Sequence, residues 1–96
     1  MKPQHFPPSR NLEQVYLIDR DAGLLCRILG LYASRGIDVL RAEYMYAAQD
    51  VMTLKVCVVN GSEGGVEVVR VLIDKAASLV GVLAAAELPT AMPKVA

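Results

Sequence analysis

Hydrophobic positions change their spacing repeatedly along this 96-residue chain, and the changes mark the boundaries of predicted elements. Alternation of apolar and polar residues predicts strands, whereas apolar residues three and four positions apart predict helices. Asp21 is placed to cap the first helix, and Gly36 is placed to end it. In chain order, the pattern predicts a strand over 13–18, a helix over 22–34, strands over 37–46 and 52–59, a helix over 66–77 and a strand over 80–87.

The apolar stripes of these elements predict which faces form the core. Residues 52–59 alternate most clearly, with Met52, Leu54, Val56 and Val58 on one face and Thr53, Lys55 and Cys57 on the other. Each helix has one inward face, formed by Leu24, Leu25, Ile28, Leu29, Leu31 and Tyr32 in the first and by Val66, Val69, Leu72, Ile73 and Ala76 in the second. Beside the first face lies a stripe of small residues at which we expect a second helix to approach closely, namely Cys26, Gly30 and Ala33.

The order of the elements predicts an α+β, ferredoxin-like βαββαβ sandwich, with a four-stranded antiparallel sheet and two helices on one face. We expect a flexible, Pro-rich N-terminal arm over 1–11, one domain over 12–88 and a C-terminal tail over 89–96. The loop over 60–65 joins the third strand to the second helix. One sheet face and two outer strand edges are then open to a partner.

Composition and charge narrow the classes of function. The formal net charge is zero, which argues against binding to nucleic acid or to an anionic membrane. The longest apolar run, over 79–86, is too short to span a bilayer, and the N-terminus does not resemble a signal peptide. Two cysteines without a CxxC spacing, Cys26 and Cys57, are expected to be free thiols. We therefore expect a cytoplasmic protein.

Other proteins of this fold need residues that the chain lacks. An RNA-recognition module needs aromatic residues on its central strands, where only Tyr16 stands. A heavy-metal-binding domain needs paired thiols in the first loop, which leads to Cys26 alone. An acyl-phosphate hydrolase needs a glycine-rich phosphate cradle, and here Gly23 stands alone near Arg20. We expect no catalytic residues, no metal and no cofactor.

Residues 19–39 read Asp-Arg-Asp-Ala-Gly-Leu-Leu-Cys-Arg-Ile-Leu-Gly-Leu-Tyr-Ala-Ser-Arg-Gly-Ile-Asp-Val. This stretch resembles the signature of ACT domains, above all that of the regulatory small subunit of acetolactate synthase. The family shows a polar loop with Pro-Gly or Ser-Gly, a helix with Gly-Leu-Phe, and then Arg-Gly-aromatic-Asn-Ile. Their places are taken here by Ala22-Gly23, by Gly30-Leu31-Tyr32 and by residues 35–39. The longer small subunits carry a second domain, so the chain resembles the short form.

The physical features of the motif, with the resemblance, predict an effector site in which Gly23 lets a ligand approach the first-turn amides of the helix. Those amides would hold a carboxylate, and Asp38, expected beside the same loop, would face an ammonium group. In ACT domains a neighbouring subunit typically completes this pocket, as the resemblance implies. The predicted ligand-binding residues are Arg20, Asp21, Ala22, Gly23, Leu24, Leu25, Asp38 and Val39.

Two residues of this site differ from the family pattern. Small subunits that sense valine have Asn where this chain has Arg20 and Asp38. An Asn amide donates and accepts hydrogen bonds, whereas Arg only donates and Asp only accepts. The pocket therefore has another specificity, or none.

These observations predict a non-catalytic ACT-type regulatory domain that pairs with a second copy of itself as a homodimer. As an acetolactate synthase small subunit, it would bind a catalytic enzyme subunit and shift its conformational equilibrium. The alternatives are a free-standing ACT protein that senses a small amino acid for another pathway, and a purely structural dimerisation or docking module.

Overall fold

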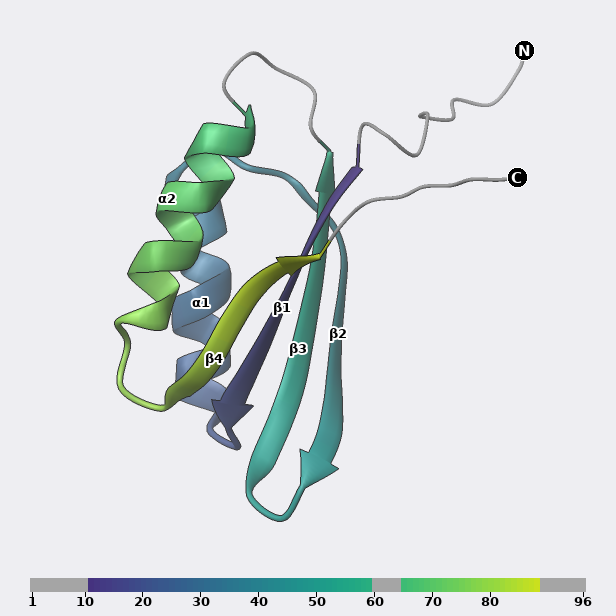
Figure 1. Cartoon of the computed structure of the whole chain (residues 1–96), viewed down its shortest axis with the longest axis vertical. Helices are drawn as coiled ribbons and strands as arrows, with labels where there is room; N and C mark the ends of the chain where they lie inside the picture. Colours follow the sequence, from purple (N-terminus) through teal and green to yellow (C-terminus); the bar gives the residue numbers. More distant parts are fainter. Residues whose placement is uncertain (1–10, 60–64, 89–96) are drawn as a thin grey trace, which may run out of the picture.

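A computed structural model describes residues 11–59 and 65–88 of the chain (Figure 1). Its elements follow in the order β1 (Asn11–Asp19), α1 (Ala22–Ser34), β2 (Val39–Ala48), β3 (Val51–Val59), α2 (Gly65–Ala77) and β4 (Val82–Leu88). The strands form one sheet in the order β2-β3-β1-β4, and every neighbouring pair is antiparallel. Both helices lie on one face of the sheet, which confirms the predicted fold class.

β2 and β4 each begin two residues later than predicted because a tight turn follows the preceding helix. After α1, Gly36 adopts a φ of +69°, and the Ile37 N–H donates to the Tyr32 carbonyl at 3.0 Å, so β2 begins at Val39 rather than at Ile37. After α2, Gly81 adopts a φ of +99°, and β4 begins at Val82.

The predicted N-terminal arm, the loop before α2 and the C-terminal tail are only partly covered by the described residues. β1 begins at Asn11, which the sequence assigned to the N-terminal arm, and α2 begins at Gly65, which it assigned to a loop. The rest of the predicted arm, of that loop and of the C-terminal tail lies outside the described residues.

The core lies between the sheet and the two helices. β3 buries the four apolar residues that its alternation predicted, and each helix buries three residues of its predicted face while the others lie partly buried beside them. Complete burial of one such side chain stabilises the fold by about 1.5–3 kcal/mol. The core residues are Leu12, Tyr16, Ile18, Leu24, Ile28, Tyr32, Met52, Leu54, Val56, Val58, Val69, Leu72 and Ala76.

A stripe on α1 and the edge strand β2 are both uncovered in the described part of the chain. The stripe of Cys26, Gly30 and Ala33 is exposed, and a Cβ added at Gly30 would meet no heavy atom within 4 Å. The expected close approach of a second helix there is therefore wrong, because the stripe points away from the packed side of α1. The other surface is edge strand β2, in which only Glu43 and Tyr44 are less than exposed.

Candidate functional site

The junction between β1 and α1, where the sequence placed most of its site, is tied to two neighbouring turns. The Asp19 N–H donates to the Gly81 carbonyl at 2.9 Å, and the Arg20 N–H donates to the Asp50 carbonyl at 2.8 Å. The Arg20 guanidinium also pairs with the Asp50 carboxylate at 3.1 Å, with both side chains mostly exposed. The strand registers that bring Asp50 and Gly81 here could not be predicted from the local sequence.

Asp21 caps α1, as the sequence predicted. Its Oδ1 accepts a hydrogen bond from the Gly23 N–H at 2.9 Å, and its carbonyl accepts from the amides of Leu24 and Leu25 at 3.0 and 3.1 Å. The first-turn amides that were expected to hold a ligand carboxylate are therefore already bonded at Gly23, Leu24 and Leu25, because the capping residue is the nearer acceptor. A Cβ added at Gly23 would lie 3.3 Å from that oxygen, so the residue leaves space beside the carboxylate.

The remaining predicted residues of α1 differ in their access to solvent. Ala22 is exposed and Leu25 is half-buried, but Leu24 is only 1% exposed and belongs to the core. A Cβ at Gly81 would approach Leu24 Cδ2 to 2.8 Å, which shows how closely the turn before β4 covers this side chain. Leu24 therefore packs in the core behind the junction and does not line its surface.

Asp38 and Val39 lie at the opposite end of the sheet from this junction. Val39 pairs with Val58, near one end of β3, whereas Asp19 pairs with Val51, at the other end. Within one chain, the expectation that Asp38 lies beside Gly23 is therefore wrong, because α1 carries the chain along the whole length of the sheet before β2 begins. Asp38 is exposed and lines a surface cavity together with Arg35.

A hydrogen-bonded chain of buried side chains crosses the core, and sequence patterning did not reveal it. The hydroxyls of Tyr16 and Tyr32 lie 2.7 Å apart, and the Tyr32 hydroxyl donates to Gln14 Oε1 at 2.7 Å. All three side chains are 0% exposed, and Gln14 Nε2 has no partner among the described residues. Because Tyr16 is buried, it is not available to stack on a base.

Burial also governs the titration of these tyrosines. It raises the pKa of Tyr16 to about 12, although the hydrogen bond with Tyr32 opposes the shift. Burial, and then the nearby Tyr16, raise the pKa of Tyr32 still further. Both side chains stay neutral at physiological pH, so they act as hydrogen-bonding groups of the core and not as acids or bases.

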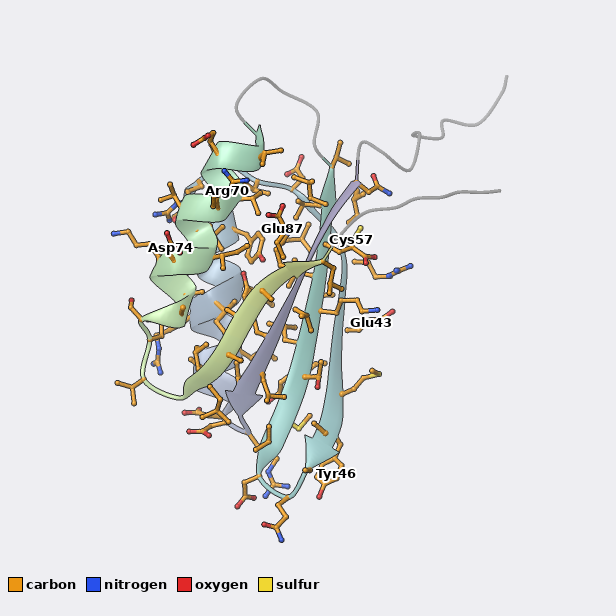
Figure 2. The ribbon with its side chains drawn as sticks, viewed as in Figure 1. Glu43, Tyr46, Cys57, Arg70, Asp74 and Glu87 are labelled. Carbon is orange, nitrogen blue, oxygen red and sulfur yellow. The ribbon has the colours of Figure 1, made fainter. Side chains whose placement is uncertain are left out.

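The open face of the sheet carries paired charges around Cys57. Arg41 lies 3.8 Å from Glu13 and 3.4 Å from Glu43, and the strand registers place Glu13 and Arg41 on either side of Cys57. Figure 2 shows Glu43 and Cys57 on the β2–β3 side of the molecule, away from the helices. Cys57 is only 7% exposed, and burial, with Glu13, raises its thiol pKa while Arg41 lowers it.

Over 11–59 and 65–88, histidine, cysteine and acidic side chains form no group of three that could hold a metal ion. Within the same residues, neither helix combines the length and the hydropathy that a membrane span requires.

The element order βαββαβ, the strand order β2-β3-β1-β4 and the two helices on one face define a ferredoxin-like fold. The structure is similar to the ACT domain of GTP pyrophosphokinase from Chlorobium tepidum, with a TM-score of 0.67 and 14% sequence identity over 82% of this chain and 97% of that one.

Two other solved structures share the fold. The acetolactate synthase small subunit from Thermotoga maritima has a TM-score of 0.63 and 19% identity over 81% of this chain and 47% of that one. The C-terminal domain of the MgtC protein from Mycobacterium tuberculosis has a TM-score of 0.68 and 15% identity over 82% of this chain and 85% of that one. No protein-family model and no curated protein matches the sequence. The likeness is one of fold, and this chain spans about half of the small subunit.

Proposed function

We propose that this chain is a non-catalytic regulatory domain of the ACT type, which forms a homodimer through strand β2 and binds a small amino acid, a catalytic subunit, or both. The observation that carries the proposal is the ACT fold together with an uncovered, apolar edge strand. The hydrogen-bonded side chains of Gln14, Tyr16 and Tyr32 lie inside the core, where no substrate reaches them.

Strand β2 has the properties of an interface. Its ten residues form the outer edge of the sheet, and three of its large apolar side chains are about half exposed: Leu40 at 49%, Met45 at 53% and Tyr46 at 64%. Figure 2 shows Tyr46 near the hairpin end of β2, far from the helices that would otherwise cover it. An unpaired edge strand invites pairing with another chain, and a two-fold axis lets the same edge serve both copies.

Pairing of two β2 strands would also bring together the two halves of the predicted ligand site, which lie at opposite ends of the sheet within one chain. When two identical strands pair antiparallel about a two-fold axis near their middle, the start of one lies beside the end of the other. Asp38 precedes β2, and the turn at Gln49 and Asp50 follows it. Asp50 holds Arg20. Asp38 of the partner subunit would therefore approach the Arg20–Gly23 junction.

The chemistry of this shared site suits a ligand with both charges. Asp38 of the partner subunit would accept hydrogen bonds from an ammonium group. Arg20 supplies a cation for a carboxylate, since the Gly23 amide is already bonded to Asp21. The Arg20–Asp50 pair is exposed and stabilises the chain by only about 0–1 kcal/mol, so a ligand carboxylate can take the place of Asp50.

A more specific, finer proposal names the regulated enzyme: we propose that the chain regulates an acetolactate synthase. It rests on the motif over 19–39 and on the shared fold with a small subunit of that enzyme. The alternatives are a free-standing amino-acid sensor for another pathway and a structural dimerisation or docking module. We place the protein in the cytoplasm in each case.

The test is to co-express the chain with the acetolactate synthase catalytic subunit encoded by the same genome and to assay that subunit with and without the chain. The finer proposal predicts co-purification and a changed response of activity to added amino acids. No complex and unchanged activity would refute a role with this enzyme. Calorimetric titration of the two variants Arg20→Gln and Arg70→Gln with the common amino acids tests the shared site, because Arg70 is an equally exposed arginine on α2, away from β2. Equal affinity of both variants would refute the site.

A further inference from the structure

Strand β4 is the second outer edge of the sheet, and its far side has no strand partner among the described residues. It pairs with β1 alone, so half of its backbone N–H and C=O groups face away from the sheet. The irregularity in this pairing lies at the start of β4, beside Val82, and residues 84–88 keep a regular register with β1. They include neither proline nor lysine, which commonly protect an edge. This stretch is therefore available to another strand.

The open face of the sheet is hollowed beside the same edge. The cavity has a volume of about 200 Å³ and an almost wholly apolar lining, formed by residues 15–17 of β1, Thr53 of β3 and residues 84–86 of β4. The hollow forms because β4 presents only the methyl groups of Ala84 and Ala86 on this face, beside larger side chains of β1. Its volume is below that of pockets that hold whole small molecules, and it suits a single aliphatic side chain.

A carboxylate without a partner lies on the other face of β4. The register places Glu87 opposite Gln14, whose side chain is buried in the core, and Figure 2 shows Glu87 between β4 and α2. Glu87 is half-buried and makes no ion pair within 4.0 Å among the described residues, and Arg70 of α2 pairs with Glu67 instead, at 3.9 Å. A cation on a neighbouring strand, opposite Glu87, would stabilise this carboxylate.

The charge of β4 argues against a second copy of the same strand as the occupant of this edge. Glu87 is the only charged residue of β4, so two paired β4 strands would bring no cation to it. With β2 also pairing, the sheet would then extend from copy to copy without closing. Successive side chains of a strand point to opposite faces. The occupant that fits is therefore an extended segment in which an aliphatic residue, for the hollow, stands next to a basic residue, for Glu87.

We propose that β4 binds such a segment of a partner protein, which adds a fifth strand to the sheet, places an aliphatic side chain in the hollow and sets a basic side chain against Glu87. Main-chain hydrogen bonds hold the segment, and the hollow and the carboxylate select it. The inference rests on the proposed function, because the partner it assigns to this edge is the catalytic subunit. Dimerisation through β2 and docking at β4 then use opposite edges of one sheet.

Four substitutions change one feature each and include two matched controls. Ala86→Phe fills the hollow, whereas Ala33→Phe places the same side chain at an exposed position of α1, away from β4. Glu87→Lys reverses the charge at the edge, whereas Glu67→Lys makes the same change on α2, where the side chain is 77% exposed. None of the four residues is buried, so we expect every variant to fold, which circular dichroism checks.

The experiment follows the fluorescence anisotropy of a labelled peptide, Gly-Thr-Leu-Lys-Leu-Thr-Val-Thr, during titration with the full chain. A second peptide has glutamate in place of the lysine. We expect saturable binding of the lysine peptide to wild type, and binding of the glutamate peptide that is weaker by about fivefold or more. Ala86→Phe should weaken binding of the lysine peptide by about fivefold or more, and Glu87→Lys should bind the glutamate peptide more tightly than the lysine peptide. Ala33→Phe and Glu67→Lys should bind as wild type does.

Equal binding of the two peptides to wild type, unchanged binding to Ala86→Phe, or no saturable binding would overturn the β4 site. The catalytic subunit tests the partner separately, since it should co-purify with wild type and Ala33→Phe but not with Ala86→Phe or Glu87→Lys. Equal co-purification with all four would overturn its assignment to β4 and leave the proposed function intact. A subunit that does not co-purify with wild type would refute the finer proposal, and the peptides would still decide whether β4 is a docking site.

Discussion

The buried Gln14–Tyr32–Tyr16 chain gives a sharp prediction about stability, because its central hydroxyl serves two partners. Tyr32→Phe removes the hydroxyl that lies 2.7 Å from both Tyr16 Oη and Gln14 Oε1. The variant leaves the Tyr16 hydroxyl and the Gln14 amide without partners, and each orphaned buried group costs about 1–3 kcal/mol. We expect a loss of about 2–6 kcal/mol, a large share of the about 5–15 kcal/mol typical of a whole domain.

The two outer members of the chain serve as matched controls. Tyr16→Phe removes one hydrogen bond and leaves the bond between Tyr32 and Gln14 intact, so we expect a loss of about 0.5–1.5 kcal/mol. Gln14→Met leaves the two tyrosines bonded and removes the Nε2 group that has no partner, so its cost should be smaller than that of Tyr32→Phe. Urea unfolding at pH 7 and one protein concentration measures all three. A loss for Tyr16→Phe equal to or larger than that for Tyr32→Phe would refute the assigned hydrogen bonds.

The dependence of stability on alkaline pH tests the burial of the same tyrosine hydroxyls, because they lose their protons in that range. Because burial raises the folded-state pKa of Tyr16 from 10.0 to about 12, the unfolded chain releases its proton first as pH rises. Stability is fully present below pH 10 and is lost as pH rises towards 12, by up to about 1.4 kcal/mol per pH unit for each tyrosine. Urea midpoints between pH 8 and 11 should therefore fall less steeply in Tyr16→Phe. Identical slopes in wild type and variant would contradict the burial of this hydroxyl.

Two further predictions concern glycines and thiols. Gly30→Ala should stabilise the chain by about 0.5–1 kcal/mol in urea unfolding, because the new methyl meets nothing within 4 Å. Gly81→Ala should cost about 1–3 kcal/mol, since its φ is +99° and the new Cβ would lie 2.8 Å from Leu24, and equal effects of the two variants would contradict both placements. In a thiol-labelling assay at pH 7.5, exposed Cys26 should react before Cys57, whose pKa burial raises, and prior labelling of Cys57 would contradict its place under Arg41 and Glu13.

The fold could be predicted because its signals are local and mutually consistent. The alternation over 52–59 and the Asp21 cap each specify one element, and the element order then restricts the topology to the βαββαβ plan. Strand starts were misplaced where a glycine in the left-handed region, Gly36 or Gly81, prolongs a turn. Such a φ depends on hydrogen bonds that only the folded chain reveals.

The candidate site was less predictable because it depends on distances across the sheet. The motif over 19–39 is contiguous in sequence, yet α1 separates its two ends by the length of the sheet. The pairing of Arg20 with Asp50 follows from the register of β1 with β3, and the register is set by the burial of whole faces. Sequence patterning likewise treats Tyr16 and Tyr32 as apolar core positions and gives no sign that their hydroxyls meet.

The proposed regulatory domain forms a homodimer through β2, and its mass in solution tests this pairing directly. Leu40 on β2 and Leu83 on β4 are 49% and 56% exposed on the two opposite edges of the sheet, so a lysine at either position costs the single chain little. Light scattering at micromolar concentration should give twice the chain mass for wild type and for Leu83→Lys, and the single-chain mass for Leu40→Lys. A wild-type chain that is monomeric, or a Leu40→Lys variant that stays dimeric, would contradict the account.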